Sequence, residues 1–151
     1  LFASFRAALS GTPCRPFVSG MKVRIAAADA VLYPDVFVTR DSRDKAREAA
    51  LAKAHPALIA EVLSDSTAAF DRGAKFAAYR KLESLQEYVL VDLEAQRIEV
   101  FRRDATNHWV LYDYGPGDSV ELASLALHLA VDELLEDTRE TRQEAAAPTL
   151  R

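Results

Sequence analysis

The chain has 151 residues, of which 50% are hydrophobic and 28% charged, and its formal net charge is −4. This composition excludes a largely disordered chain, and the length is that of one domain with a sizeable core. The sequence contains no apolar run long enough to span a membrane, and it lacks the strongly basic character of a general nucleic-acid binder. The single cysteine, Cys14, excludes an internal disulfide and favours a reducing compartment, the cytoplasm. Because the chain begins with Leu1 rather than Met, we expect a truncated N-terminus.

The first third of the chain predicts one helix followed by β-structure. Residues 2–9 are typical of a helix that ends at the Ser-Gly-Thr-Pro sequence of residues 10–13. Two β-rich runs, 14–18 and 22–28, are separated by Ser19-Gly20 and predict a hairpin. A short strand is expected over residues 35–39, and the polar segment 40–55 is interpreted as an exposed loop.

The remainder predicts a strand–helix–strand unit and then several shorter elements. Residues 57–63 form an apolar strand, and a helix follows the N-cap candidates of 64–67 and extends to about residue 82. The next strand, 87–92, then lies parallel to the first across a helical crossover. Short strands are expected at 97–103, 108–114 and 118–122, and a last helix at 130–137. This order predicts an α/β (α+β) fold with a mixed β-sheet flanked by helices.

The chain is divided into a domain and a tail. Residues 1–138 are interpreted as the domain, and residues 139–151 as a frayed acidic C-terminal tail. The acidic character is concentrated near this boundary, because residues 132–144 contain six acids and two arginines.

Two carboxylates lie on strands where a charge is unexpected. Alternation along 57–63 places Glu61 among apolar neighbours, and Asp35 begins another apolar strand directly after Pro34. Burying a charge costs several kcal/mol unless it is paired or bound to a metal. If the two strands are neighbours, both carboxylates open at one edge of the sheet, where their oxygens suit a hard cation such as Mg²⁺. The alternative, in which Glu61 pairs with an arginine and Asp35 caps a turn, stays open.

The helix after Glu61 adds a stripe of three polar residues. Asp71, Lys75 and Tyr79 are spaced four residues apart and share one face of the helix. Lys75 is within reach of the strand edge that carries the two acids. The alternative is a solvated Asp71–Lys75 salt bridge on a surface helix.

Together these residues resemble a known family. The motifs are Tyr33-Pro34-Asp35-Val36, Glu61-Val62-Leu63-Ser64 with Ser66-Thr67, Asp71-Arg72-Gly73 with Lys75 and Tyr79, and the strand EYVLVD at 87–92. From about residue 1 to about residue 135, the chain is similar to the Uma-two family of endonucleases, which belongs to the PD-(D/E)XK restriction-endonuclease-like superfamily.

The resemblance implies a restriction-endonuclease-like fold and metal-dependent hydrolysis of phosphodiester bonds in DNA. Asp35, Glu61 and the backbone carbonyl of Val62 would bind Mg²⁺ or Mn²⁺. Asp35, Glu61 and Lys75 would form the catalytic centre. Asp71 would hold Lys75 in place, and Tyr79 would contact a phosphate or pack.

Two residues depart from the pattern that the resemblance implies. Leu63 stands where the superfamily motif has a lysine, and family members resemble a variant in which Lys75 of the following helix replaces it. Gly20 stands where the family often has an acid. An inactive nuclease fold that binds nucleic acid or protein is therefore the alternative function.

Two further predictions concern partners. Arg72, Lys75, Arg80 and Lys81 lie on one helix without an acid between them, which favours weak, salt-sensitive DNA binding. The apolar strand that contains Val110, Leu111, Tyr112 and Tyr114 could pair across a two-fold axis and form a homodimer.

Overall fold

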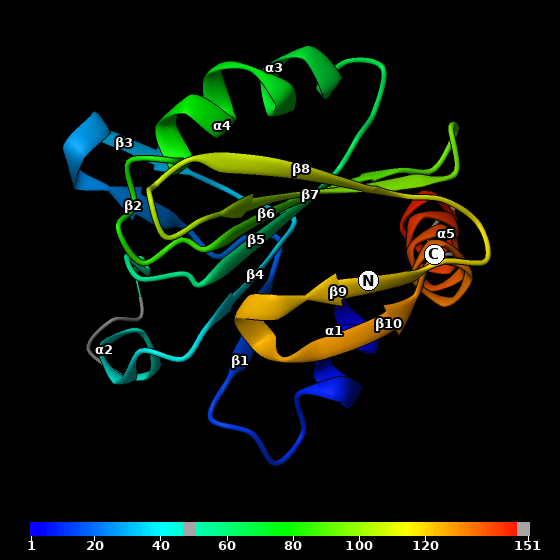
Figure 1. Cartoon of the computed structure of the whole chain (residues 1–151), viewed down its shortest axis with the longest axis horizontal. Helices are drawn as coiled ribbons and strands as arrows, with labels where there is room; N and C mark the ends of the chain where they lie inside the picture. The colour runs from blue at the N-terminus through cyan, green and yellow to red at the C-terminus, as the bar shows by residue number, and fades with distance from the viewer. Residues whose placement is uncertain (47–50, 148–151) are drawn as a thin grey trace.

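A computed structural model describes residues 1–46 and 51–147. Its centre is a six-stranded sheet in the order β1-β4-β5-β6-β7-β8 (Figure 1). The strands are β1 (Arg15–Val18), β4 (Val36–Thr39), β5 (Leu58–Val62), β6 (Glu87–Asp92), β7 (Arg97–Arg103) and β8 (Trp109–Tyr114). Only β5 and β6 are parallel neighbours in this sheet, and the other pairs are antiparallel. The predicted mixed sheet with a parallel β5–β6 pair is therefore confirmed.

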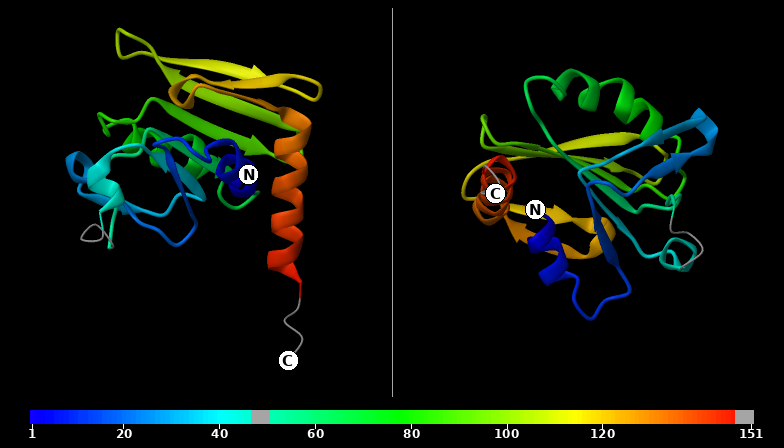
Figure 2. Two further views of the ribbon diagram at one scale, coloured as in Figure 1. Left: turned by 90° about the horizontal axis from the view of Figure 1, so that it is seen from below. Right: turned by 180° about the vertical axis from the view of Figure 1, so that it is seen from behind.

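Both faces of the sheet are covered (Figures 1 and 2). One face carries α3 (Ala68–Arg72), α4 (Ala74–Tyr79) and a small hairpin of β2 (Val23–Ile25) and β3 (Ala30–Leu32). The other carries α1 (Phe2–Ala8), the hairpin of β9 (Ser119–Leu122) and β10 (Leu127–Ala130), and α5 (Val131–Ala146). The sheet thus has a hydrophobic core on each side.

Alternation along β5 and β6 produces these two cores. Leu58 and Ala60 of β5 pack toward α1 and α5, whereas Ile59 and Leu63 pack toward α4. A strand that is buried on both faces must be apolar at nearly every position, which is the pattern of 57–63. Glu61 lies on the α4 side by the same alternation, and its placement determines the site described below.

The predicted hairpin between residues 14–18 and 22–28 is wrong. β1 pairs with β4, and β2 pairs with β3 to form a separate two-stranded sheet. The turn at Ser19-Gly20 carries the chain from the sheet edge onto one face, where Val23 and Ile25 are fully buried. The burial of Val23 and Ile25 against the sheet favours this arrangement over the pairing of β1 with β2 that a short turn would produce.

The other boundaries differ in smaller ways. The strand predicted at 118–122 is β9, which pairs with β10 in a separate two-stranded sheet. The helix predicted to extend to residue 82 is divided at Gly73 into α3 and α4, and the second part ends at Tyr79. The last helix continues to Ala146 instead of ending at residue 137. The division of the chain at residue 138 remains a prediction, and residues 148–151 of the predicted tail lie outside the described residues.

The segment 40–55 is not wholly exposed. It contains α2 (Ser42–Lys45), and Asp44 is buried there. Asp44 accepts hydrogen bonds from the backbone N–H groups of Ala54 and His55, at 3.0 and 2.8 Å. A carboxylate that satisfies two backbone donors and fixes a connection explains why this polar segment folds back on itself. Residues 47–50 of the predicted loop lie outside the described residues.

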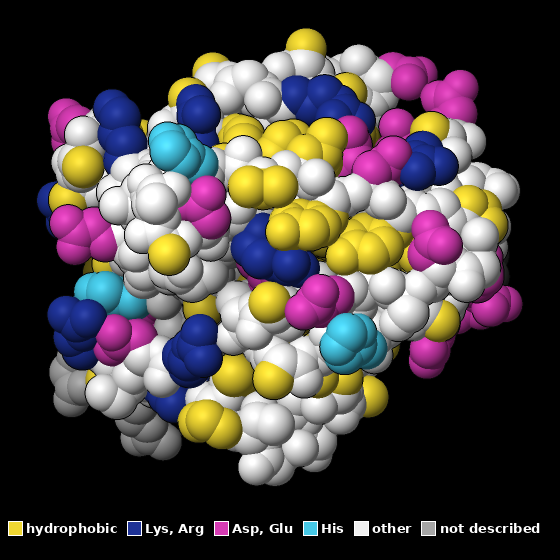
Figure 3. Space-filling model, in the orientation of Figure 1, with side chains coloured by type: hydrophobic (Ala, Val, Ile, Leu, Met, Phe, Trp, Pro, Cys, Tyr) yellow, Lys and Arg dark blue, Asp and Glu magenta, His cyan; other side chains and the backbone are white. Residues whose placement is uncertain are grey.

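Two surface features bear on the partner predictions. Val110, Leu111 and Tyr112 are exposed on β8, which is an edge strand of the main sheet, and Figure 3 shows hydrophobic side chains gathered over this part of the surface. The homodimer remains a prediction.

Within the described residues, none of the helices combines the length and the apolar character that crossing a membrane requires.

Candidate active site

The site lies where β4 and β5 separate. The last pair of the two strands is Val36 with Ala60, so Asp35 and Glu61 stand just beyond the ladder. Two crossed hydrogen bonds take the place of the ladder. The backbone N–H of Asp35 donates to Glu61 Oε2 at 3.1 Å, and the backbone N–H of Val62 donates to Asp35 Oδ2 at 2.7 Å. The two acids, which are 26 residues apart in the sequence, are therefore held side by side at one edge.

Glu61 is the most buried acid of the pair, with 1% of its surface exposed. Its carboxylate receives Lys75 Nζ at 2.7 Å and the hydroxyl of Tyr79 at 3.2 Å, both on Oε1. Lys75 and Tyr79 belong to α4, which covers the face of the sheet from which Glu61 projects. A buried carboxylate is tolerated because these donors and the Asp35 amide compensate for its lost hydration.

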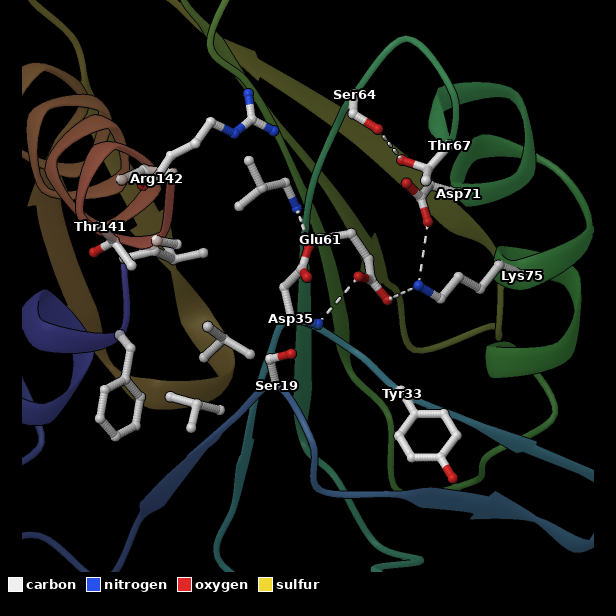
Figure 4. A pocket seen from close by; sticks show the side chains of 17 residues that line it. Ser19, Tyr33, Asp35, Glu61, Ser64, Thr67, Asp71, Lys75, Thr141 and Arg142 are labelled. Atoms are coloured by element: carbon white, nitrogen blue, oxygen red, sulfur yellow. Dashed lines mark hydrogen bonds and ion pairs between the residues drawn. The ribbon is translucent and has the colours of Figure 1, made fainter. Parts of the chain in front are cut away.

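Lys75 is held between two carboxylates. Its ammonium group lies 3.2 Å from Asp71 Oδ1 as well as 2.7 Å from Glu61 Oε1 (Figure 4). Asp71 is itself buried, and its backbone carbonyl accepts a hydrogen bond from the hydroxyl of Tyr88 at 2.8 Å. Tyr88 on β6 thus ties the C-terminal turn of α3 to the sheet. Asp71 and Lys75 thus form an ion pair across Gly73, where α3 ends and α4 begins.

The burial of the site shifts the acid–base properties of its members. Burial raises the pKa of Glu61 to about 7, although Lys75 and the Asp35 amide oppose the shift. Burial alone would lower the pKa of Lys75, but Glu61 and Asp71 raise it above its ordinary value. Burial, and then the neighbouring Glu61, also raise the pKa of Tyr79. At neutral pH the site therefore contains a charged ammonium group, a neutral phenol and a carboxyl group near its midpoint of titration.

The acids open into a cavity of about 550 Å³. One side is formed by β4, β5 and α4, and the opposite side by α1 and α5. The polar and charged side chains of its wall are Ser19, Tyr33, Asp35, Glu61, Ser64, Thr67, Asp71, Lys75, Thr138, Thr141 and Arg142. Figure 4 shows Asp35 and Glu61 between Tyr33 on one side and Arg142 on the other. A small substrate group that enters this cavity meets the acids and Lys75 together.

The donor set fits a hard divalent cation. Asp35 and Glu61 supply carboxylate oxygens, and Val62, whose carbonyl is the third predicted ligand, also lines the cavity. Asp35 uses one oxygen for the Val62 amide, which leaves the other for a further partner. The described residues contain no group of three or more His, Cys, Asp and Glu side chains placed to hold a metal ion. Mg²⁺ needs no larger group, because it is typically held by one or two carboxylates, and water and substrate oxygens complete its octahedral shell.

The structure brings together all the side chains that the sequence analysis singled out for the site. Asp35, Glu61, Lys75, Asp71 and Tyr79 form one connected network.

The structure gives a local reason for each of the two residues that depart from the expected motif, Leu63 and Gly20. The Leu63 side chain is buried in the core under α4, so a lysine at this position would have to place its charge in that core. Gly20 adopts a positive φ of 98° in the turn after β1, a conformation that favours glycine.

The four basic residues predicted to bind DNA differ in how they are placed. Arg72 pairs with Glu99 of β7 at 2.6 Å, and Arg80 lies over the ring of Phe76 at 4.9 Å. Lys75 points into the site. Arg72 and Lys75 are thus paired with acids, whereas Arg80 and Lys81 are exposed, and DNA binding by this stretch remains a prediction.

The sequence analysis missed the contribution of α5. Thr138, Thr141 and Arg142 line the cavity, yet the predicted helix ended at residue 137. The polar composition beyond Leu135 hid this part of the helix, since only an apolar stripe would have extended the prediction.

Comparison with known proteins supports this description at the level of family and fold. Residues 1–132 match the family model Uma2, described as "Putative restriction endonuclease". Two relatives come from Synechocystis sp. (strain ATCC 27184 / PCC 6803 / Kazusa). The chain is 37% identical over 124 residues to "Uncharacterized protein slr1290", which covers 82% of this chain and 64% of that protein. It is 38% identical over 106 residues to "Uncharacterized protein sll1609", which covers 70% of this chain and 59% of that protein. The chain thus spans about three fifths of the length of these curated relatives.

A solved structure shares the fold. The crystal structure of "a putative nuclease belonging to DUF820" from Anabaena variabilis ATCC 29413 superimposes with a TM-score of 0.69 at 20% identity. The match covers 89% of this chain and 75% of that one. The predicted restriction-endonuclease-like mixed sheet flanked by helices is therefore confirmed, and the chain belongs to the Uma2 family of restriction-endonuclease-like proteins.

Proposed function

We propose that this protein is an endonuclease that hydrolyses phosphodiester bonds of DNA with the help of Mg²⁺ or Mn²⁺. Asp35, Glu61 and the backbone carbonyl of Val62 hold the ion, and Lys75 completes the catalytic centre. The observation that carries the proposal is the convergence of two acids and one ammonium group, from three separate segments, at the edge of one cavity. Membership of the Uma2 family supports the reaction class.

Each residue has a chemical task in this reaction. When bound, the divalent ion polarises the phosphoryl oxygens and lowers the pKa of a water molecule. Asp35 and Glu61 are fixed in place by their crossed hydrogen bonds, so their oxygens need little reorganisation. The Lys75 ammonium group lies 2.7 Å from Glu61 in the same cavity, where it would stabilise the negative charge that develops on the phosphoryl group.

Asp71 and Tyr79 hold the catalytic side chains in position. Asp71 contacts Lys75 at 3.2 Å and restrains its ammonium group. The Tyr79 hydroxyl donates to Glu61 and orients its carboxylate toward the cavity. Removal of either group should loosen the site and lower the rate less than removal of Asp35, Glu61 or Lys75.

The proposal is tested by incubating the protein with DNA in EDTA, Mg²⁺ or Mn²⁺. Cleavage is expected only with the divalent ion, and Asp35→Asn or Glu61→Gln should abolish it. Lys75→Met should lower the rate by roughly 10²–10³-fold, the effect of removing one donor aimed at a developing oxyanion. Asp65→Asn is the matched control, because Asp65 is an exposed acid that follows β5 and does not line the cavity.

A second function competes with the first. Leu63 fills the place of the usual lysine with a buried apolar side chain, which favours an inactive fold that binds nucleic acid or protein. Metal-independent DNA binding without cleavage would support that alternative and contradict the nuclease. Cleavage that survives both Asp35→Asn and Glu61→Gln would contradict the assigned site.

Two wider statements belong to the proposal as well. Cys14 is a free, half-buried cysteine, which fits a reducing compartment, so we place the activity in the cytoplasm. The nuclease domain is proposed to comprise residues 1–138, and the following turns of α5 add Thr141 and Arg142 to the wall of its cavity.

A further inference from the structure

The cavity extends beyond the acids to a part of the chain that the family match does not include. The match ends at residue 132, whereas Thr138, Thr141, Arg142 and Ala145 of α5 form one side of the cavity. Figure 2 shows α5 extending away from the body of the molecule at this side. The wall opposite the catalytic acids is therefore supplied by the turns of α5 that follow the matched region.

Arg142 is the cation on the α5 side of this cavity, and it also lines a second cavity beside Asp65, Asp92 and Glu94 without forming an ion pair with any of them. Two cations line the cavity within the described residues, and the first, Lys75, is paired with both Glu61 and Asp71. Among the described residues, Arg142 makes no ion pair and one hydrogen bond, which its guanidinium group donates to the backbone carbonyl of Leu63 at 3.1 Å. The bond to Leu63 fixes the guanidinium beside the end of β5. The remaining N–H groups of its planar fork are suited to a phosphate.

Tyr33 stands on the other side of the acids. It lines the cavity two residues before Asp35, and 54% of its surface is exposed. Figure 4 places Asp35 and Glu61 between Tyr33 and Arg142. A tyrosine ring held at a cavity mouth offers a flat surface on which a nucleic-acid base stacks.

We infer that the cavity binds an unpaired nucleotide strand, with a phosphate on Arg142 and a base on Tyr33 at opposite ends of the acid pair. This inference rests on the proposed nuclease function and specifies its substrate class. Glu61 is 1% exposed and the Lys75 side chain 11% exposed, so the reacting phosphate must enter a recess rather than rest on an open surface. In a duplex the bases are paired and stacked inside the helix, and a single strand can present both a phosphate and an uncovered base face.

The test compares oligonucleotides of one sequence in single-stranded and duplex form. Binding is measured by fluorescence anisotropy on the Asp35→Asn background in EDTA, where cleavage does not occur and one repelling charge is removed. The single strand should bind at least tenfold more tightly than the duplex. Tyr33→Ala should weaken single-strand binding by about 5- to 150-fold, the range expected from loss of one base–aromatic stack, and Tyr33→Phe should stay within threefold.

Arg142 has a matched control on the same helix. Arg139 lies one turn earlier and lines a different cavity, on another side of α5. Arg142→Ala should weaken single-strand binding and reduce the slope of log affinity against log salt by about 0.7, the value for one lost phosphate contact on a single strand. Arg139→Ala should leave both quantities unchanged, and Arg142→Lys should restore most of the salt slope.

The inference is overturned if the duplex binds as tightly as the single strand, or if Arg142→Ala and Arg139→Ala behave alike. These results are distinct from failure of the nuclease proposal. Metal-dependent cleavage by the unaltered protein with a preference for duplex would contradict the inference alone. Selective single-strand binding through Tyr33 and Arg142, without cleavage in Mg²⁺ or Mn²⁺, would uphold it and contradict the nuclease.

Discussion

Replacement of Lys75 by methionine tests the electrostatics of the site directly. The substitution keeps the apolar stem but removes the ammonium group that lies 2.7 Å from Glu61. Glu61 then remains buried without its counter-ion, a change that usually costs about 3–5 kcal/mol. Tyr79 and the Asp35 amide still donate to Glu61, and the Lys75 side chain is 11% exposed, so the lower end applies, about 3 kcal/mol. For a domain of this size the melting temperature should fall by roughly 6–12 °C.

The pH dependence of this loss distinguishes charge from packing. Removal of Lys75 takes away the partner that lowers the pKa of Glu61, so the folded-state pKa rises further above the unfolded value. A neutral Glu61 needs no counter-ion, and the penalty should therefore be larger at pH 8 than at pH 5. Urea denaturation at the two pH values measures it, with the exposed Lys81→Met as a control expected to stay within about 0.5 kcal/mol. The reasoning fails if Lys75→Met is as stable as the parent at pH 8, if the penalty does not change with pH, or if adding Glu61→Gln does not relieve it.

The remaining predictions concern neighbouring contacts. Tyr79→Phe removes one hydrogen bond to Glu61 and should cost about 1 kcal/mol in urea denaturation, with metal-dependent cleavage retained within tenfold. Glu87→Gln removes the carboxylate that lies 2.8 Å from the Arg102 guanidinium and leaves Arg102 only the more exposed Glu121 at 3.7 Å, so it should cost about 3 kcal/mol in urea denaturation while metal-dependent cleavage persists. Because burial raises the pKa of Glu61 to about 7, its contribution to the stability of the metal-free protein falls as pH rises from about 4.5 to 7. The stability of the parent relative to Glu61→Gln should accordingly be greater at pH 5 than at pH 8, and the opposite trend would contradict the shift.

The central strands could be predicted because their pattern has one physical cause. Residues 57–63 and 87–92 are apolar at almost every position, as strands buried on both faces must be. The hairpin strands β3 and β10 have three and four residues, too few to establish a period. Their pairing depends on tertiary burial, which also overrode the hairpin expected at Ser19-Gly20.

The candidate site was predictable only as a set of residue types. An acid on an apolar strand indicates that something must compensate for its charge, but it does not say what. Glu61 and Glu87 give the same signal in the sequence, and the structure separates them. Glu61 opens into a cavity beside Asp35 and Lys75, whereas Glu87 is enclosed by Arg102 and by the backbone N–H groups of Ala123 and Ser124, in the short η3 (Ala123–Leu125) turn. The first arrangement leaves oxygens accessible to a ligand, and the second fixes a connection.

The two cations of the cavity, Lys75 and Arg142, come from helices whose positions over the sheet could not be predicted from the sequence. Lys75 reaches Glu61 because Gly73 divides the helix and α4 lies over the sheet, a geometry that spacing alone does not determine. Arg142 reaches the cavity because the polar end of α5 stays helical and passes the end of β5.

The most direct test of the account is a crystal of the protein grown with Mn²⁺, examined for anomalous scattering. The account predicts a peak within coordination distance of a carboxylate oxygen of Asp35 and one of Glu61, with Lys75 beside it, and predicts its loss in Asp35→Asn. A crystal saturated with Mn²⁺ that shows no peak between these two acids, or a peak elsewhere only, would contradict the account.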